Sequence, residues 1–153
     1  MNSLNSEYFA TTDMIPEQPP IADPNTLYIL VVDDSAVMRD MLNAKLRELG
    51  GSSLQVIIDM ASSGEEAVRM AKTNPYDVVF MDVEMPGMSG LDACREIKKI
   101  RGSRIAMVSG RAASDDHSAG HDAGCDNYLT KPPHDADLRV IMRLVSIKKL
   151  TML

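Results

Sequence analysis

A carboxylate stands at the end of an apolar run in the middle of the chain. Residues 78–81 are continuously apolar, Asp82 follows them, and Pro86 and Gly87 then end the extended segment. Such a run is typical of a central parallel strand that is covered on both faces. Open α/β sheets place their chemistry just beyond the carboxyl ends of such strands. Taken alone, Asp82 is either a functional carboxylate at that edge or the cap of a loop or helix.

Three other predicted strands also end in polar residues. Asp33 and Asp34 follow the first predicted strand. Ser109 and Lys131 follow the fourth and fifth predicted strands. Because the strands of a parallel sheet point the same way, these polar groups should converge on one crevice. The carboxylates of Asp33, Asp34 and Asp82 would repel one another unless a cation lies between them. An all-oxygen ligand set suits Mg²⁺, which often binds together with a phosphate.

A phosphoryl group attracted to this crevice would meet complementary chemistry. Lys131 supplies a mobile positive charge and Ser109 supplies a hydroxyl donor for the phosphoryl oxygens. Asp82 can then act as the nucleophile and form an aspartyl phosphate. The protein contributes mainly positioning and charge stabilisation to such a reaction.

The elements that must position these residues alternate along the chain. Runs with strand character alternate with segments of helical period, which indicates a doubly wound parallel five-stranded sheet with helices on both faces. The expected strands are 27–32, 54–60, 78–81, 105–108 and 127–130, and the expected helices are 35–49, 64–72, 90–100, 112–123 and 135–150. Residues 1–25 are rich in proline and lack a hydrophobic period, so they are expected to form a disordered or loosely ordered leader, with 151–153 a short tail.

Composition limits the function classes that remain. At 153 residues, the chain suits one domain, and its net charge of −6 argues against non-specific nucleic-acid binding. No apolar stretch is long enough to span a bilayer, and no secretory signal is evident. Cys94 and Cys125 lack zinc-site spacing and are expected to be reduced thiols of a cytoplasmic protein.

Taken in order, these motifs resemble the receiver domain of two-component response regulators, the CheY-like, flavodoxin-like (βα)5 fold. The resemblance covers about 125 residues, 26–150. It is carried by Val31-Val32-Asp33-Asp34-Ser35, by Asp82-Val-Glu-Met-Pro-Gly-Met-Ser-Gly90, by Ser109 as the switch hydroxyl, and by Tyr128-Leu-Thr-Lys131-Pro132 with Tyr128 as the switch aromatic. It implies a sheet of order 2-1-3-4-5 and a cis peptide between Lys131 and Pro132.

The same resemblance implies a metal site. Asp34, Asp82 and the backbone carbonyl of Glu84 would hold Mg²⁺, with Asp33 helping through water. Mn²⁺ could substitute for Mg²⁺.

The resemblance also implies a mechanism. Asp82 would take a phosphoryl group from a phosphohistidine on a sensor histidine kinase or a histidine phosphotransfer protein. Ser109 would be drawn to the phosphoryl oxygens, with Lys131 as counter-charge, and Tyr128 would turn inward into the vacated space. The face made by the fourth helix, fifth strand and fifth helix would change its packing and signal to a downstream protein target.

Glu84 and Arg111 are particular to this chain. They lie two residues after Asp82 and two after Ser109, and their opposite charges suggest a pair that gates water access to the phosphoryl group. The alternative is a pair of solvated surface side chains, which contributes only about 0–1 kcal/mol.

Two helices also carry expectations of their own. The expected helix 112–123 has no large apolar residue and contains Gly120, which predicts low local stability. The last helix has one apolar stripe for the sheet and a second stripe almost opposite, which suggests either a homodimer or partner surface, or partial cover by neighbouring loops or the leader. The sheet-facing stripe is Leu138, Met142 and Val145 with Ile141 beside it, and the second stripe is Val140, Leu144 and Ile147.

Other functions remain open at this point. The leading prediction is a stand-alone phosphorylated signalling module that is not an enzyme beyond accepting and losing its own phosphoryl group. It is expected to act through protein contacts, because 153 residues leave no room for an output domain. The alternatives are a pseudo-receiver that binds partners without phosphate, and an aspartate-nucleophile phosphatase. The intact crevice residues argue against the first. Glu at position 84, where such phosphatases carry Asp, argues against the second.

Overall fold

One parallel sheet organises the chain. The computed structural model describes residues 23–52, 54–110 and 114–151. Its five strands lie in the order β2-β1-β3-β4-β5, which confirms the predicted 2-1-3-4-5 topology. The elements are β1 (Thr26–Val32), α2 (Ala36–Gly50), β2 (Gln55–Ala61), α3 (Gly64–Thr73), β3 (Val78–Asp82), α4 (Gly90–Ile100), β4 (Arg104–Ser109), α5 (Ser114–Asp122), β5 (Asn127–Thr130) and α6 (Asp135–Thr151).

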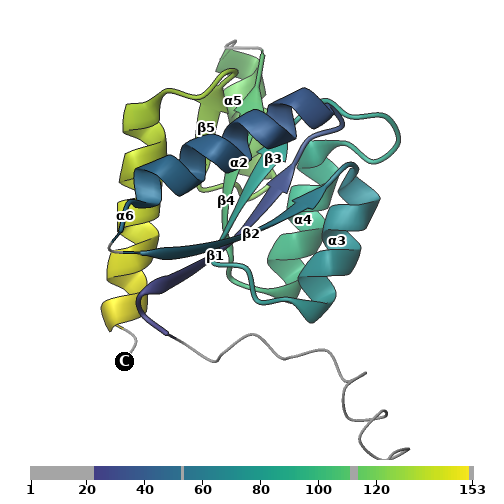
Figure 1. Cartoon of the computed structure of the whole chain (residues 1–153). Helices are drawn as coiled ribbons and strands as arrows, with labels where there is room; N and C mark the ends of the chain where they lie inside the picture. The colour runs from purple at the N-terminus through teal and green to yellow at the C-terminus, as the bar shows by residue number, and fades with distance from the viewer. Residues whose placement is uncertain (1–22, 53, 111–113, 152–153) are drawn as a thin grey trace, which may run out of the picture.

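The helices cover the sheet in two layers (Figure 1). On one face, α2 and α6 pack against β1, β3 and β4 through a cluster that includes Leu42, Leu46 and Ile141. On the other face, α3 and α4 pack through small side chains such as Ala67 and Cys94. Because successive residues of a strand point to opposite faces, the continuous apolar runs of β1 and β3 supply both clusters.

Serine side chains begin three of the helices. Ser35, Ser63 and Ser89 each have extended backbone and accept a hydrogen bond from the amide three residues later, at the starts of α2, α3 and α4. A cap of this kind typically contributes about 1 kcal/mol to stability. These caps fix where each helix leaves the carboxyl edge of the sheet, and therefore the loops around the candidate site.

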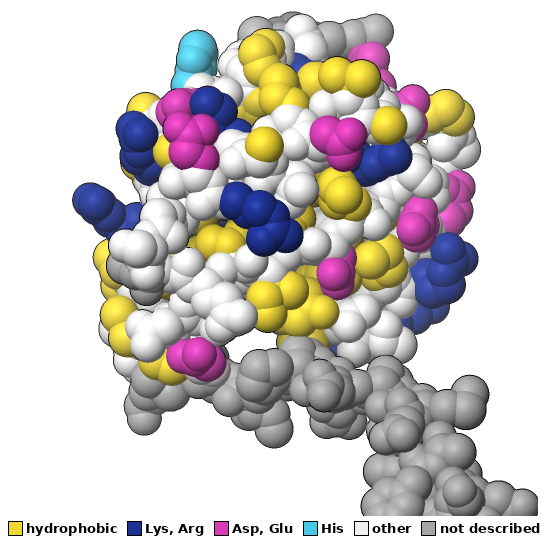
Figure 2. Space-filling model, viewed as in Figure 1, with side chains coloured by type: hydrophobic (Ala, Val, Ile, Leu, Met, Phe, Trp, Pro, Cys, Tyr) yellow, Lys and Arg dark blue, Asp and Glu magenta, His cyan; other side chains and the backbone are white. Residues whose placement is uncertain are grey.

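The apolar side of α2 is narrower than its sequence suggests. Leu42 and Leu46 are buried, but Val37 is 76% exposed and Met41 is 39% exposed. Val37 lies five positions before Leu42, about 140° around the helix, so it cannot share the face that contacts the sheet. Figure 2 shows that on the side covered by α2 the hydrophobic side chains lie in separate small groups between charged ones.

The two stripes predicted for α6 are both present. Leu138, Ile141, Met142 and Val145 are at most 5% exposed and face the sheet. The second stripe is open, with Val140, Leu144 and Ile147 exposed by 56%, 42% and 51%. Among the described residues, the loops therefore do not cover it.

The cysteines and the helix lengths bear on two further sequence expectations. Cys94 and Cys125 are free thiols, the first buried and the second half-buried. Within the described part of the chain, every helix is too short or too polar to cross a membrane.

Candidate functional site

Strand register brings the predicted site residues together. Val32 of β1 pairs with Met81 of β3, so Asp33 and Asp82 are the next residues on neighbouring strands. Asp82 pairs with Val108, which places Ser109 one step further along β4. Ser109 in turn pairs with Thr130, and Lys131 follows directly. Polar residues that are far apart in the sequence thus meet at the carboxyl edge of the sheet.

Lys131 links the two buried carboxylates of this edge. Its Nζ lies 2.7 Å from Oδ2 of Asp33 and 3.3 Å from Oδ2 of Asp82. Asp33 and Asp82 are only 2% and 5% exposed, whereas Asp34 beside them is exposed. Carboxylate oxygens of Asp33, Asp34 and Asp82 lie within 4.8 Å of one another. The predicted acidic cluster with its lysine counter-charge is therefore assembled.

This arrangement shifts the proton affinities of the site. Burial, together with the neighbouring charge of Asp33, raises the pKa of Asp82 to about 6 against the opposing effect of Lys131. Burial alone would lower the pKa of Lys131, but its contacts with Asp33 and Asp82 raise it above the ordinary value. Lys131 thus stays protonated. Asp82 is ionised at neutral pH, but its burial makes the charged carboxylate less favourable than it would be in water. Such a carboxylate is suited to act as a nucleophile or a metal ligand.

The turn after β1 is held by both the side chain and the backbone of Asp33. Its side-chain Oδ1 accepts a hydrogen bond from the Ser35 amide at 2.8 Å. Arg39 of α2 donates from Nη1 to the Asp33 carbonyl oxygen at 2.7 Å. Neither contact was predicted, although an Asp two residues before a helix-capping serine is a recognisable turn pattern. Together they fix the remaining Asp33 oxygen, Oδ2, toward Lys131.

The loop after β3 is held by Glu65 and Gly90. The Glu84 amide donates to Oδ1 of Asp82 at 3.3 Å, and the Met88 amide donates to Oε1 of Glu65 at 2.7 Å. A Cβ on Gly90 would overlap the Asp82 carbonyl oxygen, so only glycine allows α4 to start this close to β3. Glu65 was missed at the sequence level because it lies on α3, far from Met88 in the chain.

The predicted switch residues lie on neighbouring strands. Ser109 is buried at 2% exposure at the end of β4. The Tyr128 ring of β5 stacks on His117 of α5, with ring centroids 4.2 Å apart, and a Cβ on Gly120 would lie 2.8 Å from that ring. The Tyr128 hydroxyl is buried and has no hydrogen-bond partner among the described residues. Tyr128 therefore connects the sheet edge to α5.

The structure describes only one residue of the predicted gating pair of Glu84 and Arg111. Glu84 is exposed beside Asp82, whereas Arg111 lies outside the described residues, so their pairing stays a prediction.

The cis peptide that the resemblance implied is present between Lys131 and Pro132. The implied Mg²⁺ fits the donor set, because the clustered donors are hard carboxylate oxygens and exposed Asp34 leaves space for metal-bound water.

Comparison with known proteins agrees with this geometry. Residues 29–143 match the family model of the response regulator receiver domain. The chain is 36% identical over 115 residues to the transcriptional regulatory protein YvrH of Bacillus subtilis (strain 168), covering 75% of this chain and 47% of that protein. It is 34% identical over 126 residues to hybrid signal transduction histidine kinase G of Dictyostelium discoideum, covering 80% of this chain and 4% of that protein.

One similar domain has been solved with a bound metal ion. The receiver domain of sensor histidine kinase PA1611 from Pseudomonas aeruginosa PAO1, solved with a magnesium ion coordinated in its active site cleft, superposes with a TM-score of 0.68 at 31% identity. The match covers 78% of this chain and 98% of that domain. By contrast, the chain spans about half the length of YvrH. With its sheet order, acidic edge and family match over residues 29–143 in agreement, the chain belongs to the response regulator receiver domain family of two-component signalling.

Proposed function

We propose that Asp82 is the phosphoacceptor of a phosphorylation-dependent signalling protein. The observation that supports this most is the contact of Lys131 Nζ with the buried carboxylates of Asp33 and Asp82 at one sheet edge. A carboxylate oxygen of Asp82 attacks the phosphorus of a phosphohistidine on a sensor histidine kinase or phosphotransfer protein. The new O–P bond forms as the N–P bond breaks, and the departing imidazole takes a proton from water.

The surrounding residues have separate roles in this proposal. Lys131 exchanges part of its contact with Asp82 for a phosphoryl oxygen, and Ser109 donates its hydroxyl to another. Asp33, Asp34, Asp82 and the Glu84 carbonyl would hold Mg²⁺, or Mn²⁺ in its place. When bound, the metal offsets the negative charge that the phosphoryl group brings to the acidic edge.

The proposal assigns no external substrate to the protein. Water later attacks the aspartyl phosphate and restores Asp82, so the chain accepts and loses its own phosphoryl group rather than acting as an enzyme on others. We include the gating role of Glu84 and Arg111 in this step. Glu84→Ala and Arg111→Ala should each change the rate of dephosphorylation. An unchanged rate in both variants would contradict the gating role.

The output is a protein contact through α5, β5 and α6. Movement of Ser109 toward the phosphoryl group alters the packing beneath the Tyr128 ring, which stacks on His117 of α5. The exposed stripe of Val140, Leu144 and Ile147 on α6 gives the same face an apolar surface for a downstream target or a second copy. A cytoplasmic location is part of the proposal, because the free thiols Cys94 and Cys125 suit a reducing compartment.

One experiment separates this function from its alternatives. The full chain is incubated with Mg²⁺ and a small acyl phosphate, and the intact mass and released phosphate are followed. The proposal predicts a labile single phosphorylation that Asp82→Asn abolishes and that Asp137→Asn, an exposed Asp on α6, leaves intact. Turnover of an external phosphate ester would instead identify a phosphatase, and the absence of any modification would identify a phosphate-independent binding module.

A further inference from the structure

A hollow lies at the amino edge of the sheet, opposite the acidic crevice. Its volume is about 480 Å³, within the range of small-molecule sites. Three segments surround it: the residues that lead into β3, the residues that lead into β4, and the last turns of α6. The lining residues are Pro75, Tyr76, Asp77, Arg101, Gly102, Ser103, Arg104, Val145, Lys148 and Lys149, and the hollow is called the amino-edge pocket below.

The amino-edge pocket is strongly basic in an acidic protein. Four of its lining residues are Lys or Arg and one is Asp, whereas the whole chain has a net charge of −6. Lys149 Nζ pairs with Oδ2 of Asp77 at 3.0 Å. Arg101, Arg104 and Lys148 have no carboxylate partner within the part of the chain that the structure describes.

The two arginines are positioned by neutral groups, and their charges stay uncompensated. Arg101 donates from Nε to the Ala71 carbonyl oxygen at 3.0 Å, and Arg104 donates from Nη1 to Oδ1 of Asn127 at 2.9 Å. Each contact uses one of the donors of a guanidinium, which has five. An anion in the pocket would therefore lie beside three positive charges that no carboxylate pairs with in the described chain.

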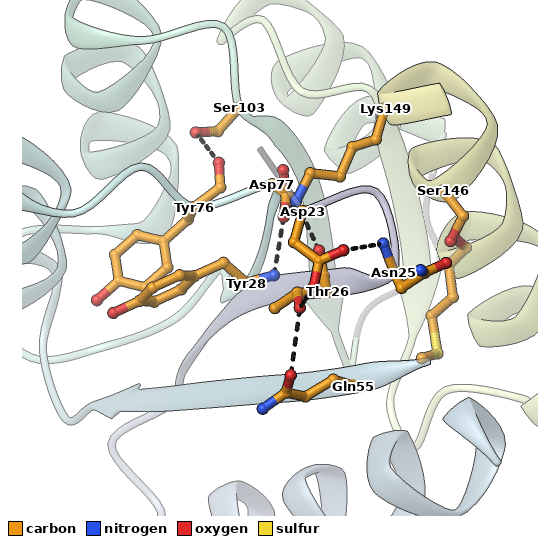
Figure 3. Close-up of polar contacts among 11 residues, drawn as sticks. Asp23, Asn25, Thr26, Tyr28, Gln55, Tyr76, Asp77, Ser103, Ser146 and Lys149 are labelled. Carbon is orange, nitrogen blue, oxygen red and sulfur yellow. Dashed lines mark hydrogen bonds and ion pairs between the residues drawn. The ribbon is translucent and has the colours of Figure 1, made fainter. Parts of the chain in front are cut away.

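Several residues that line the pocket make polar contacts with distant segments of the chain (Figure 3). Asp77 accepts the Tyr28 amide at 2.8 Å as well as Lys149, and Lys149 also donates to the Thr26 carbonyl oxygen. The hydroxyl of Ser103, which is 6% exposed, donates to the Tyr76 carbonyl oxygen at 2.7 Å. These contacts tie the end of α6 to the starts of β1 and β3, so the cationic groups project from anchored segments.

We propose that the amino-edge pocket binds a small, multiply charged phosphate ligand of the pyrophosphate or organic phosphate class. Arginine forks match phosphate oxygens bidentately, and Lys148 adds a point charge from the third side. A hollow of about 480 Å³ matches the size of a small polyanion rather than that of an extended macromolecule. The proposal is independent of phosphorylation at Asp82, because that carboxylate lies at the opposite end of β3.

The test is a titration of the full chain with pyrophosphate in EDTA, followed by backbone amide NMR. Shifts should concentrate at Gly102, Ser103 and residues 145–149. Lys148→Glu should raise the dissociation constant roughly tenfold or more, the effect of losing one charge-assisted hydrogen bond. Arg143→Glu is the matched control, because it makes the same charge change on α6 outside the pocket, and its dissociation constant should stay within about twofold of the wild type.

Further arms of the titration identify the ligand class and keep the proposal open to refutation. Stronger binding of pyrophosphate than of citrate supports a phosphate ligand, whereas equal binding of both overturns that class. Shifts confined to the Asp33 and Asp82 region, or equal weakening by Lys148→Glu and Arg143→Glu, overturn the site. Tighter binding of a DNA oligonucleotide that both variants weaken would replace the pocket with a general polyanion surface. Thermal unfolding of each variant checks that the fold is retained.

Discussion

At the scale of single residues, Lys131 balances two charges that could not otherwise share a buried edge. Asp33 and Asp82 are almost fully enclosed, and among the described residues only Lys131 forms an ion pair with their carboxylates. Removing one member of a buried ionic group leaves the others uncompensated, which is usually more costly than the net contribution of the intact group. Lys131 therefore stabilises the site before any metal or phosphoryl group binds.

A lysine deletion tests this balance. Lys131→Met should lower the free energy of unfolding by about 2 kcal/mol at pH 7.5 in EDTA, because Lys131 is partly exposed and solvent screens some of the loss. Mg²⁺ should stabilise the variant more than the wild type, since it replaces the missing charge. Urea unfolding measures both effects. Lys99→Met removes an exposed lysine that pairs with Glu96, and it should change stability by less than about 0.5 kcal/mol. Equal effects of the two substitutions would contradict the assignment.

The raised pKa of Asp82 makes a second prediction at this scale. Folding raises this pKa from 3.8 to about 6, so the native state binds the Asp82 proton more tightly than the unfolded state does. The ionised carboxylate therefore reduces stability above pH 6, and this cost fades as the pH falls toward 3.8. Asp82→Asn should stabilise the metal-free protein by about 1–2 kcal/mol at pH 7.5, with a gain that shrinks below pH 6. A gain that is constant with pH, or a loss at pH 7.5, would show that the pKa is not raised.

At the scale of elements, the start of α4 against the end of β3 sets the shape of the site. The Gly90 amide donates to the Val83 carbonyl oxygen at 2.9 Å, and a Cβ at this position would collide with the Asp82 carbonyl oxygen. Gly90→Ala should therefore destabilise the fold by about 3 kcal/mol, because backbone rather than a flexible side chain must move. Gly102→Ala is the control, since a Cβ added there would have no atom within 4 Å. Comparable unfolding midpoints for the two variants would contradict this prediction.

The same scale shows what sequence reasoning can and cannot reach. The carboxyl-edge site was predictable because Asp33, Asp82 and Ser109 each directly follow an apolar run, Lys131 directly follows the predicted strand 127–130, and parallel topology brings those strand ends together. Apolar residue type alone would overstate the burial of α2, since Val37 is apolar but 76% exposed. Helical spacing already separates Val37 from Leu42, whereas only the packing of α2 on the sheet shows that Met41 stays 39% exposed.

The contacts that hold the site were mostly beyond such reasoning. Glu65 reaches the Met88 amide from α3, and Arg39 reaches the Asp33 carbonyl from within α2. Charged residues on helix surfaces are usually solvated, so their sequence carries no signal for these partners. The cations of the amino-edge pocket were missed for a related reason. Arg101 and Arg104 lie where the chain enters β4 while Lys148 ends α6, and only the tertiary fold brings them together.

At the scale of the whole molecule, charge is distributed between the two ends of the sheet. The carboxyl edge carries the acidic cluster of Asp33, Asp34 and Asp82, and the amino edge carries the cations around the pocket. The central strands β1, β3 and β4 are largely buried on both faces, with β3 fully enclosed. The central strands thus separate two edges of opposite charge.

Unequal stability across the molecule gives a further prediction. In α5, only Gly120 is buried among the residues whose side chains the structure describes, and the helix is held to β5 mainly by the stack of His117 on Tyr128. Amides of α5 should therefore exchange with solvent much faster than those of β1 and β3, because opening α5 exposes little apolar surface. Hydrogen exchange read by mass spectrometry measures this difference, and equally slow exchange in α5 and β3 would contradict it.

Phosphorylation should then act on this weakly held part of the fold. With Mg²⁺ and an acyl phosphate, exchange in α5 and β5 should change more than exchange in α3, since Tyr128 of β5 stacks directly on His117 of α5. Asp82→Asn treated with the same donor should show no change, which separates phosphorylation from an effect of the reagent. A uniform change in every helix would indicate global stabilisation instead, and it would mean that α5, β5 and α6 are not the responding face.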